Sequence, residues 1–442
     1  MAQALAVDAN GRVLAVGTAR QVTRFGGDEV DLRGRVVLPG FTDAHGHLRH
    51  LAQALQSVDL TDAVSADDAA QRVARFIDAH RPEGWITGRG WDQTRWPGGA
   101  FPSAAVLDRV VPRQPVALTR VDGHALWANR AALAAAGVDE NTEDPPGGRI
   151  LRDASGKPSG VLIDAATSLV SRRIPAPGPA VLDGALAAAA QRCAAAGLCG
   201  VHEMGMDGEA IASLRRLVDA GRLPLRIRVA INGAGSTWQA WRGRGPERRY
   251  RDRLSVTMLK LFADGALGSR GAALLAPYTD DPGNSGLELA TRDEIERWTR
   301  EAVRAGFQVC THAIGDRANR NVLDAYERVL AEQPGDRRLR IEHAQVLAPD
   351  DVPRFRQLGV LPSMQPAHAI SDGAWAEERL GPDRVRYAYA WRSLLDTGTV
   401  IAAGSDFPVE PPDPVAGIAA AVVRRVRATG RVWHPEQRMT RA

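Results

Sequence analysis

Short apolar runs recur along the chain, and most neighbouring runs enclose a segment of helical pattern. The first run lies at residues 35–41, and seven more follow residue 181. Apolar runs that alternate with helices are typical of parallel βαβ units. In order, the eight runs are RVVLPGF, LCGVHEM, LPLRIRVAI, SVTMLKLFA, FQVCTHAIG, LRIEHAQ, GVLPSMQP and TVIAAGSDFP. We therefore predict the α/β class and a (β/α)8 TIM-like barrel, with a doubly wound sheet as the alternative.

Two segments depart from this alternation. ALAVDANGRVLAVG, at residues 4–17, holds two alternating runs around Asn10-Gly11, which is a strong signal for a β-hairpin. Residues 55–180 instead carry Pro/Gly-rich turns and four of the ten tryptophans. We expect three parts from this pattern. They are a hairpin region at 1–35, a barrel built from 36–54 and 181–442, and a subdomain at 55–180 that is inserted after the first barrel strand.

Composition narrows the class of protein. The formal net charge is only +4 and 44% of the residues are hydrophobic, which is ordinary for a soluble globular enzyme. Acidic residues interrupt the basic run at 241–253, so we interpret it as a solvated loop rather than a nucleic-acid site. No apolar stretch approaches the length of a membrane span, and the N-terminus does not have the pattern of a signal peptide. The three cysteines show neither metal-ligand spacing nor an even number, so we expect reduced thiols in a cytoplasmic protein.

Polar residues gather at the carboxyl ends of the predicted strands, where barrel enzymes place their chemistry. They are His45 and His47 at the first strand, Lys260 in the fourth, His312 in the fifth, His343 in the sixth and Asp406 in the eighth. Side chains two residues apart in an extended segment point to the same side, so His45 and His47 can share one cation. His312 and His343 could hold another. Asp406 completes a set that suits zinc or a related divalent ion. A lone histidine is more often a hydrogen-bonded core or rim residue, but six such residues together indicate a metal site.

One of these residues, Lys260, is unexpected. The chain has 56 lysines and arginines, yet its only lysines are Lys157 and Lys260. Lys260 lies in the apolar run VTMLKLF, which predicts a buried strand. The alternative is a lysine whose long side chain reaches the surface, but the apolar neighbours on both sides argue against it.

Several motifs give the chain a resemblance to the amidohydrolase superfamily. They are PGFTDAHGHL, KLFADGALGSRGAALLAPY, THAIGDRANRNVLDAYE, RIEHAQ and AAGSDFPVEPPDP, in the order that the superfamily has them. HALWANRAAL at 124–133 is similar to amidohydrolase family 3, the branch that includes N-substituted formamide deformylases. The resemblance implies that the hairpin belongs to a small β-sandwich. This sandwich is expected to be incomplete, because the chain starts within the family's first strands and ends before its last ones.

The resemblance also implies a binuclear metal centre. In two-metal members of the superfamily, the fourth-strand lysine reacts with carbon dioxide, and the resulting carbamate (a carboxylysine) bridges both metals. This implies a carboxylated Lys260 and two divalent ions, zinc by analogy, with manganese, iron or cobalt as alternatives. The other implied ligands are His45, His47, His312, His343 and Asp406. A buried lysine can lose its proton, whereas an arginine stays charged and cannot form the bridge.

The implied function is that of a metal-dependent hydrolase acting on a C–N bond other than a peptide bond. A metal-bridged hydroxide would attack the substrate, and Asp406, as the catalytic residue, would pass the proton to the leaving amine. The expected substrates are N-substituted formamides, amides or cyclic amides with an apolar substituent under the inserted subdomain. Loop position makes Trp91, His124, Arg270 and Arg317 the candidates for substrate binding, although structural salt bridges would equally explain either arginine.

Two other functions stay open. A one-metal deaminase of the same superfamily would use the first-strand histidines, His312 and Asp406 without a bridging lysine, so Lys260 argues against it. A chain shortened at both ends could instead be a non-catalytic relic. We expect a small-molecule substrate and neither nucleic acid nor membrane as a partner. The open edge of the hairpin could pair with a second copy and form a homodimer.

Overall fold

The computed structural model describes residues 2–121 and 123–440, and the chain divides into two compact units, Met1–Gly40 and Phe41–Ala442. The first unit contains the predicted hairpin, in which β1 (Ala4–Val7) pairs antiparallel with β2 (Val13–Gly17). Helix α1 (Ala19–Val22) follows, and the Thr18 side chain caps it by accepting the amide proton of Gln21. Within its described residues this unit holds one two-stranded sheet.

Eight parallel strands form the main sheet of the second unit, and their order in the sheet follows their order in the chain. Gly46 and Phe407 form a parallel bridge that brings the last strand back beside the first, so the barrel is nearly closed. This sequential order fits the predicted barrel rather than a doubly wound sheet. The strands are β3 (Phe41–Gly46), β10 (Leu198–Met206), β11 (Arg226–Asn232), β13 (Leu254–Phe262), β14 (Gln308–Ala313), β15 (Arg340–His343), β16 (Leu361–Met364) and β17 (Ala402–Ala403), and β12 (Glu247–Tyr250) pairs with β13.

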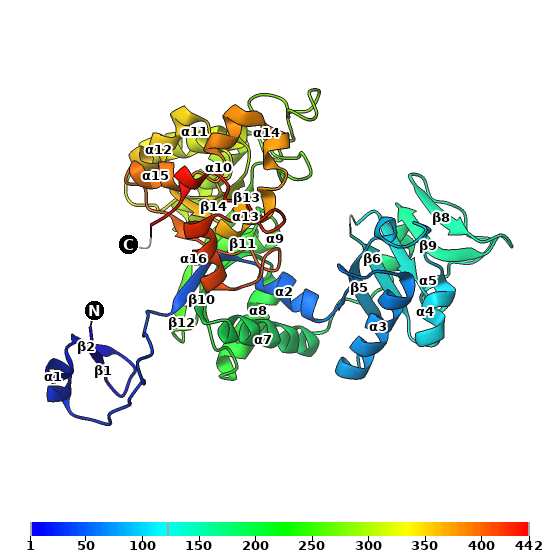
Figure 1. Ribbon diagram of the computed structural model, residues 1–442, viewed down its shortest axis with the longest axis horizontal. Helices are drawn as coiled ribbons and strands as arrows, with labels where there is room; N and C mark the ends of the chain where they lie inside the picture. The colour runs from blue at the N-terminus through cyan, green and yellow to red at the C-terminus, as the bar shows by residue number, and fades with distance from the viewer. Residues whose placement is uncertain (1, 122, 441–442) are drawn as a thin grey trace. The chain divides into compact units, whose positions relative to one another are not determined.

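The helices of this unit pack around the barrel strands (Figure 1). Alternate strand residues such as Val201, Leu259 and Ile341 are fully buried and belong to one hydrophobic core with the helices. Because strand side chains alternate between faces, the intervening residues point into the barrel, and several of these are polar. The helices are α2 (Leu48–Leu55), α7 (Pro179–Ala195), α8 (Gly208–Asp219), α9 (Ser236–Arg242), α10 (Arg292–Arg304), α11 (Asp316–Glu332), α12 (Val352–Leu358), α13 (Pro366–Asp372), α14 (Ala376–Arg384), α15 (Trp391–Asp396) and α16 (Pro414–Val423).

The first barrel strand begins later than the sequence pattern indicates. Residues 35–41 were predicted as a strand, but Val36 is 76% exposed and the strand runs from Phe41 to Gly46. The prediction is wrong because Pro39 has no amide proton to donate to a sheet and Gly40 follows it directly. The boundary between the compact units accordingly lies at residues 40 and 41 rather than at 35 and 36. His45 thus lies inside the strand and not after it.

Residues between α2 and α7 form a sheet of their own, in the order β4-β5-β6-β7-β9-β8. Trp91 and Trp127 are fully buried in its hydrophobic core, and helices α3, α4 and α5 accompany the sheet (Figure 1). The strands are β4 (Val58–Asp59), β5 (Ile86–Trp91), β6 (Val116–Arg120), β7 (Ala125–Ala128), β8 (Gly148–Arg152) and β9 (Pro158–Asp164). The helices are α3 (Ala66–His80), α4 (Ala104–Val110), α5 (Arg130–Ala136) and α6 (Thr167–Ser171).

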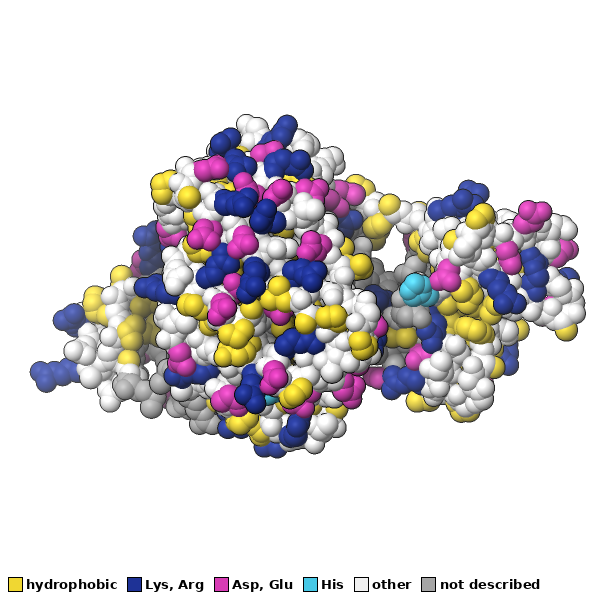
Figure 2. Space-filling model, turned by 90° about the horizontal axis from the view of Figure 1, so that it is seen from above, with side chains coloured by type: hydrophobic (Ala, Val, Ile, Leu, Met, Phe, Trp, Pro, Cys, Tyr) yellow, Lys and Arg dark blue, Asp and Glu magenta, His cyan; other side chains and the backbone are white. Residues whose placement is uncertain are grey.

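Charged side chains of both signs are interspersed on the face drawn in Figure 2. This mixture agrees with the small net charge of +4. Among the described residues, no helix is both long enough and apolar enough to cross a membrane.

Candidate metal centre

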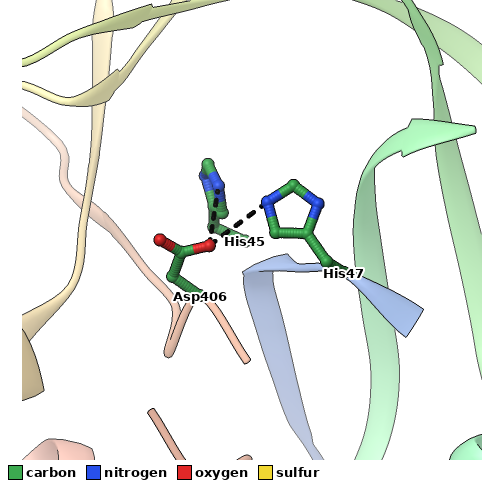
Figure 3. Close-up of side chains that lie close together, drawn as sticks. All are labelled: His45, His47 and Asp406. Carbon is green, nitrogen blue, oxygen red and sulfur yellow. Dashed lines mark ion pairs between the residues drawn. The ribbon is translucent and has the colours of Figure 1, made fainter. Parts of the chain in front are cut away.

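The first and last barrel strands bring three predicted ligands together. His45 lies in β3, His47 follows that strand, and Asp406 follows β17 (Figure 3). Backbone hydrogen bonds join the two segments along what we call the seam between β3 and β17. The amide of Asp406 donates to the carbonyl of His45 over 2.7 Å, and the amide of His47 donates to the carbonyl of Phe407 over 2.8 Å. The seam therefore holds the three side chains in a fixed register.

The geometry of this first group suits a divalent cation. Asp406 Oδ1 lies 3.5 Å from His45 Nε2 and 3.2 Å from His47 Nε2 (Figure 3). His45 Nε2 is buried and makes no hydrogen bond with any described residue, which costs free energy unless another group fills the site. Two imidazole nitrogens and one carboxylate oxygen are a donor set that zinc and related ions bind. These residues fit a cation.

A second group shares the same carboxylate. His343 at the end of β15 and His368 on α13 place ligand atoms within 4.8 Å of each other and of Asp406. The predicted ligand His312 lies beside this group, with its ring centre 4.6 Å from that of His343. However, His312 Nε2 lies 3.5 Å from Asp264 Oδ1. His368 was not among the predicted ligands, because it lies on a helix and not at a strand end.

Lys260 lies on β13 and is 1% exposed, so the alternative in which its side chain reaches the surface is wrong. Its Nζ atom lies 4.9 Å from the centre of the Phe262 ring. Burial lowers the pKa of the Lys260 amine, although the negative charges of Glu342 and Asp406 oppose this effect. A lowered pKa favours the neutral amine, which is the form that can react with carbon dioxide.

Hydrogen bonds at the Nδ1 atoms orient two of the histidines. His45 Nδ1 lies 2.6 Å from Glu342 Oε2, and His343 Nδ1 lies 2.7 Å from Gln365 Oε1. Both oxygens accept hydrogen bonds, so each Nδ1 carries the proton and each Nε2 keeps a free lone pair. A histidine that binds a metal through Nε2 is commonly fixed in this way. Neither Glu342 nor Gln365 was predicted, because their partners lie on other strands.

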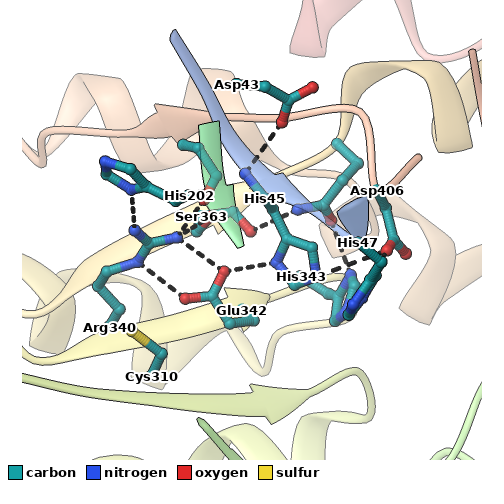
Figure 4. Close-up of polar contacts among 12 residues, drawn as sticks. Asp43, His45, His47, His202, Cys310, Arg340, Glu342, His343, Ser363 and Asp406 are labelled. Atoms are coloured by element: carbon teal, nitrogen blue, oxygen red, sulfur yellow. Dashed lines mark hydrogen bonds and ion pairs between the residues drawn. The ribbon is translucent and has the colours of Figure 1, made fainter. Parts of the chain in front are cut away.

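Arg340 anchors Glu342 inside the barrel (Figure 4). Its guanidinium donates to both Glu342 oxygens, at 2.8 and 2.9 Å, and to Ser363 Oγ and the Ala44 carbonyl. It also lies 2.8 Å from His202 Nδ1. Burial raises the pKa of Glu342, but the charge of Arg340 and the hydrogen bond with His45 outweigh it, so the pKa lies well below its ordinary value. Glu342 therefore stays ionised and holds the His45 ring.

Removing one partner of this buried ion pair should destabilise the fold strongly. We expect Arg340→Gln to lower the free energy of unfolding by roughly 3–5 kcal/mol, because Glu342 would keep its charge without compensation. Chemical denaturation followed by circular dichroism measures the change. The control is Arg300→Gln on α10, which breaks the partly exposed ion pairs with Glu296 and Glu332. Water screens exposed charges, so the control should change the free energy of unfolding far less, and equal changes would contradict the prediction.

Backbone strain coincides with two of the ligands. His343 has φ 73° and Asp406 has φ 60°, values in the left-handed region that residues other than glycine rarely adopt. Such conformations cost free energy and persist where the surrounding structure imposes them, often at functional sites. Here the strained residues are ligands of the two groups.

The buried carboxylate of Asp264 fixes the long loop after β13 beside the candidate metal centre. Asp264 accepts hydrogen bonds from the amides of Ala273, Ile314 and Gly315, at 2.8–2.9 Å. Burial raises the pKa of Asp264 to about 7, even though these hydrogen bonds favour the ionised form. The Asp264 side chain thus fixes the loop to the end of β14, where His312 lies.

The four predicted substrate contacts lie outside both ligand groups. Trp91 is 0% exposed and its Nε1–H donates to the Leu118 carbonyl over 2.8 Å, so packing in the inserted sheet accounts for this side chain. His124 is exposed and lies 2.8 Å from Asp164. Arg270 forms an ion pair of 2.9 Å with Asp280, as the salt-bridge alternative expects. Arg317 lies in the first turn of α11, directly after the strand that carries His312.

A nearly closed parallel barrel with histidine and carboxylate groups at one end of its strands defines the class of metal-dependent hydrolases. The chain belongs to the amidohydrolase family, whose sequence profile matches residues 28–442. Its fold is also that of a solved structure, an uncharacterized metal-dependent hydrolase from Pyrococcus furiosus. The TM-score is 0.81 and the identity 29%, over 99% of this chain and 87% of that one.

Two relatives show how diverse the family is. The chain is 35% identical to the putative amidohydrolase YtcJ of Bacillus subtilis over 405 residues. The matched region covers 90% of this chain and 75% of the relative. It is 29% identical to the N-substituted formamide deformylase of Arthrobacter pascens, over 99% of this chain and 83% of the relative. The resemblance to this family that the motifs predicted is therefore confirmed.

Proposed function

We propose that this chain hydrolyses a C–N bond other than a peptide bond, in an N-substituted formamide, an amide or a cyclic amide. The observation that carries the proposal is the position of one carboxylate between two groups of histidines. Asp406 Oδ1 faces His45 and His47, while Asp406 Oδ2 lies 3.8 Å from His368, beside His343. A carboxylate placed in this way can bind a metal ion and also accept a proton from a water molecule.

Two divalent cations would occupy the site, with zinc proposed and manganese, iron or cobalt as alternatives. His45 and His47 would hold one cation, and His312 and His343 the other, while Lys260 as a carbamate and Asp406 complete the set. When bound, the cations lower the pKa of a water molecule and polarise the carbonyl group of the substrate.

Asp406 is the proposed catalytic residue. Burial raises the pKa of Asp406, but the electrostatic interaction with the His45 ring and the hydrogen bond with His47 outweigh burial and hold the pKa well below its ordinary value. The carboxylate is therefore ionised at neutral pH and can accept the proton of the attacking water. Since it is a weak base, it holds this proton briefly and releases it readily to the leaving nitrogen.

Lys260 would contribute a bridging carbamate. Its neutral amine would form a bond to the carbon of carbon dioxide while one C–O double bond becomes single, and it would release one proton to water, leaving an anionic group with two oxygen atoms. The burial of Lys260 and the lowered pKa of its amine support this step. An arginine in the same place could not react in this way.

The substrate class rests on the similarity to the N-substituted formamide deformylase. Arg270 and Arg317 follow the strands that carry Lys260 and His312, and we propose both as contacts for the polar part of the substrate, with His124 as a further contact. The three cysteines are free thiols. Free thiols suit a reducing compartment, and we propose a cytoplasmic enzyme on that ground.

Metal content measured together with hydrolysis tests the proposal. Protein purified with bicarbonate and added zinc should contain about two metal atoms per chain by elemental analysis. The same protein should hydrolyse members of a panel of N-substituted formamides and amides, and a chelator should remove the activity. A reproducible value near one metal atom with full activity would favour the one-metal deaminase. Bound metal without any hydrolysis of the panel would reject the proposed substrate class.

A further inference from the structure

His368 faces the Asp406 carboxylate at a distance that suits two ligands of one cation. Its Nε2 lies 3.8 Å from Asp406 Oδ2, too far for a hydrogen bond but within the span of two ligands that bind one cation. His343, His368 and Asp406 each offer a ligand atom within 4.8 Å of the others. The group has the same composition as the first one, with two imidazole nitrogens and one carboxylate oxygen.

The His368 Nε2 atom is also buried and makes no hydrogen bond with any described residue. The side chain as a whole is 13% exposed. A buried nitrogen without a partner costs free energy, because water solvates it in the unfolded chain. A cation between this atom and Asp406 would remove that cost.

His368 lies near a residue that orients His343. Gln365 is the extended residue directly before helix α13, and His368 lies in the first turn of that helix. Gln365 Oε1 accepts the Nδ1 proton of His343 over 2.7 Å, and its own Nε2 donates to the Ser363 carbonyl over 3.0 Å. The rings of His343 and His368 are nearly parallel, at 14° with centres 6.2 Å apart. Strand β15 and helix α13 therefore each bring one imidazole close to Asp406.

The neighbouring His312 is placed differently. Its Nε2 is buried without a hydrogen-bond partner among the described residues, but it lies 3.5 Å from Asp264 Oδ1. His312 does not fall within a three-residue ligand group with Asp406 in the described part of the chain.

We infer that His368 is a direct ligand of the second cation, together with His343 and Asp406 Oδ2. This inference rests on the proposed two-cation centre and changes the ligand set that the sequence predicts. The cation ligands would then include a helix residue from beyond β16 as well as residues at strand ends.

Binding of Co²⁺ tests the inference without any measurement of hydrolysis. Wild-type protein freed of metal should bind about two Co²⁺ per chain, with visible absorption that reports histidine ligands. His368→Ala should bind one Co²⁺ as before, while the affinity for the other falls on the order of a hundredfold or more, beyond the 10–100-fold typical of residues that only support a ligand. Added imidazole should restore part of the second absorption change. His368→Gln, which keeps a polar side chain, should lose the same Co²⁺, so a folding defect of the alanine variant would not decide the result.

The matched control is His50→Ala, because His50 is exposed and belongs to neither group, although its ring centre lies 5.0 Å from that of His47. This variant should bind two Co²⁺ with unchanged affinity. Two Co²⁺ bound tightly by both His368 variants would overturn the inference, even if their KM for substrate rose. Wild-type protein that binds no second Co²⁺ would instead reject the two-cation centre itself.

Discussion

Lys260→Arg should abolish binding of the second cation and lower the hydrolysis rate on the order of 10³-fold or more, since loss of metal assistance removes several kcal/mol of transition-state stabilisation. The arginine keeps a positive charge in a buried position where the proposed centre needs an anionic oxygen. The buried site, 1% exposed in the wild type, gives the guanidinium no route to solvent. Elemental analysis and steady-state kinetics on the same preparation measure both effects.

The other Lys260 variants separate a carbamate from a packing residue. Lys260→Ala should also lose the second cation, and short carboxylic acids that enter the vacated space should restore part of the binding. Lys260→Glu should keep some metal because it supplies a carboxylate, although its shorter reach weakens the bridge. A packing lysine would produce the reverse order, with arginine tolerated best and glutamate worst.

Lys157→Arg is the matched control for these variants. Lys157 is the other lysine of the chain and is exposed in the turn between β8 and β9. Its replacement should leave metal content and rate unchanged. If Lys260→Arg also kept both metal atoms and a near-normal rate, Lys260 would not carry a bridging carbamate.

Asp406→Asn should lower kcat by roughly 10²–10⁴-fold, the usual contribution of a positioned acid–base group. The amide keeps the shape of the side chain but cannot accept the proton of the attacking water. It is also a weaker metal ligand than a carboxylate, so metal content must be measured alongside kcat. With metal supplied in excess, the loss in kcat should persist, because the base is still absent.

Asp351→Asn serves as the comparison for Asp406→Asn. Asp351 is a buried carboxylate as well, but it pairs with Arg320 and Arg354 away from both ligand groups. Its replacement can lower stability, yet kcat per folded molecule should stay within a few-fold of the wild type. If Asp406→Asn with restored metal retained wild-type kcat, another group would have to be the base.

The sequence allowed the barrel and most members of the two candidate ligand groups to be predicted, because both depend on local pattern. Apolar runs separated by helices mark parallel strands, and residues at their carboxyl ends meet in any barrel. The first strand was misplaced because its inner face carries Asp43 and His45, which hide the strand pattern. The apolar run before it ends in Pro39-Gly40 and is exposed.

Residues that act through partners on other strands could not be predicted in the same way. Glu342 precedes His343 in the chain but supports His45, which is 297 positions away. Trp91 was predicted as a substrate contact from its expected position in a loop, but it ends strand β5 and packs in the hydrophobic core of the inserted sheet. His368 follows a strand by a few residues on a helix, where pattern analysis of strand ends does not reach.

The seam between β3 and β17 determines when the two ligand groups can form during translation. His45 emerges from the ribosome with the first barrel strand, whereas Asp406, its partner across the seam, emerges only after the last one. Neither ligand group can therefore assemble on the nascent chain until nearly all of the barrel has been made. An incomplete nascent chain can bind a metal ion only weakly, through single histidines. Tight metal binding therefore requires the closed barrel.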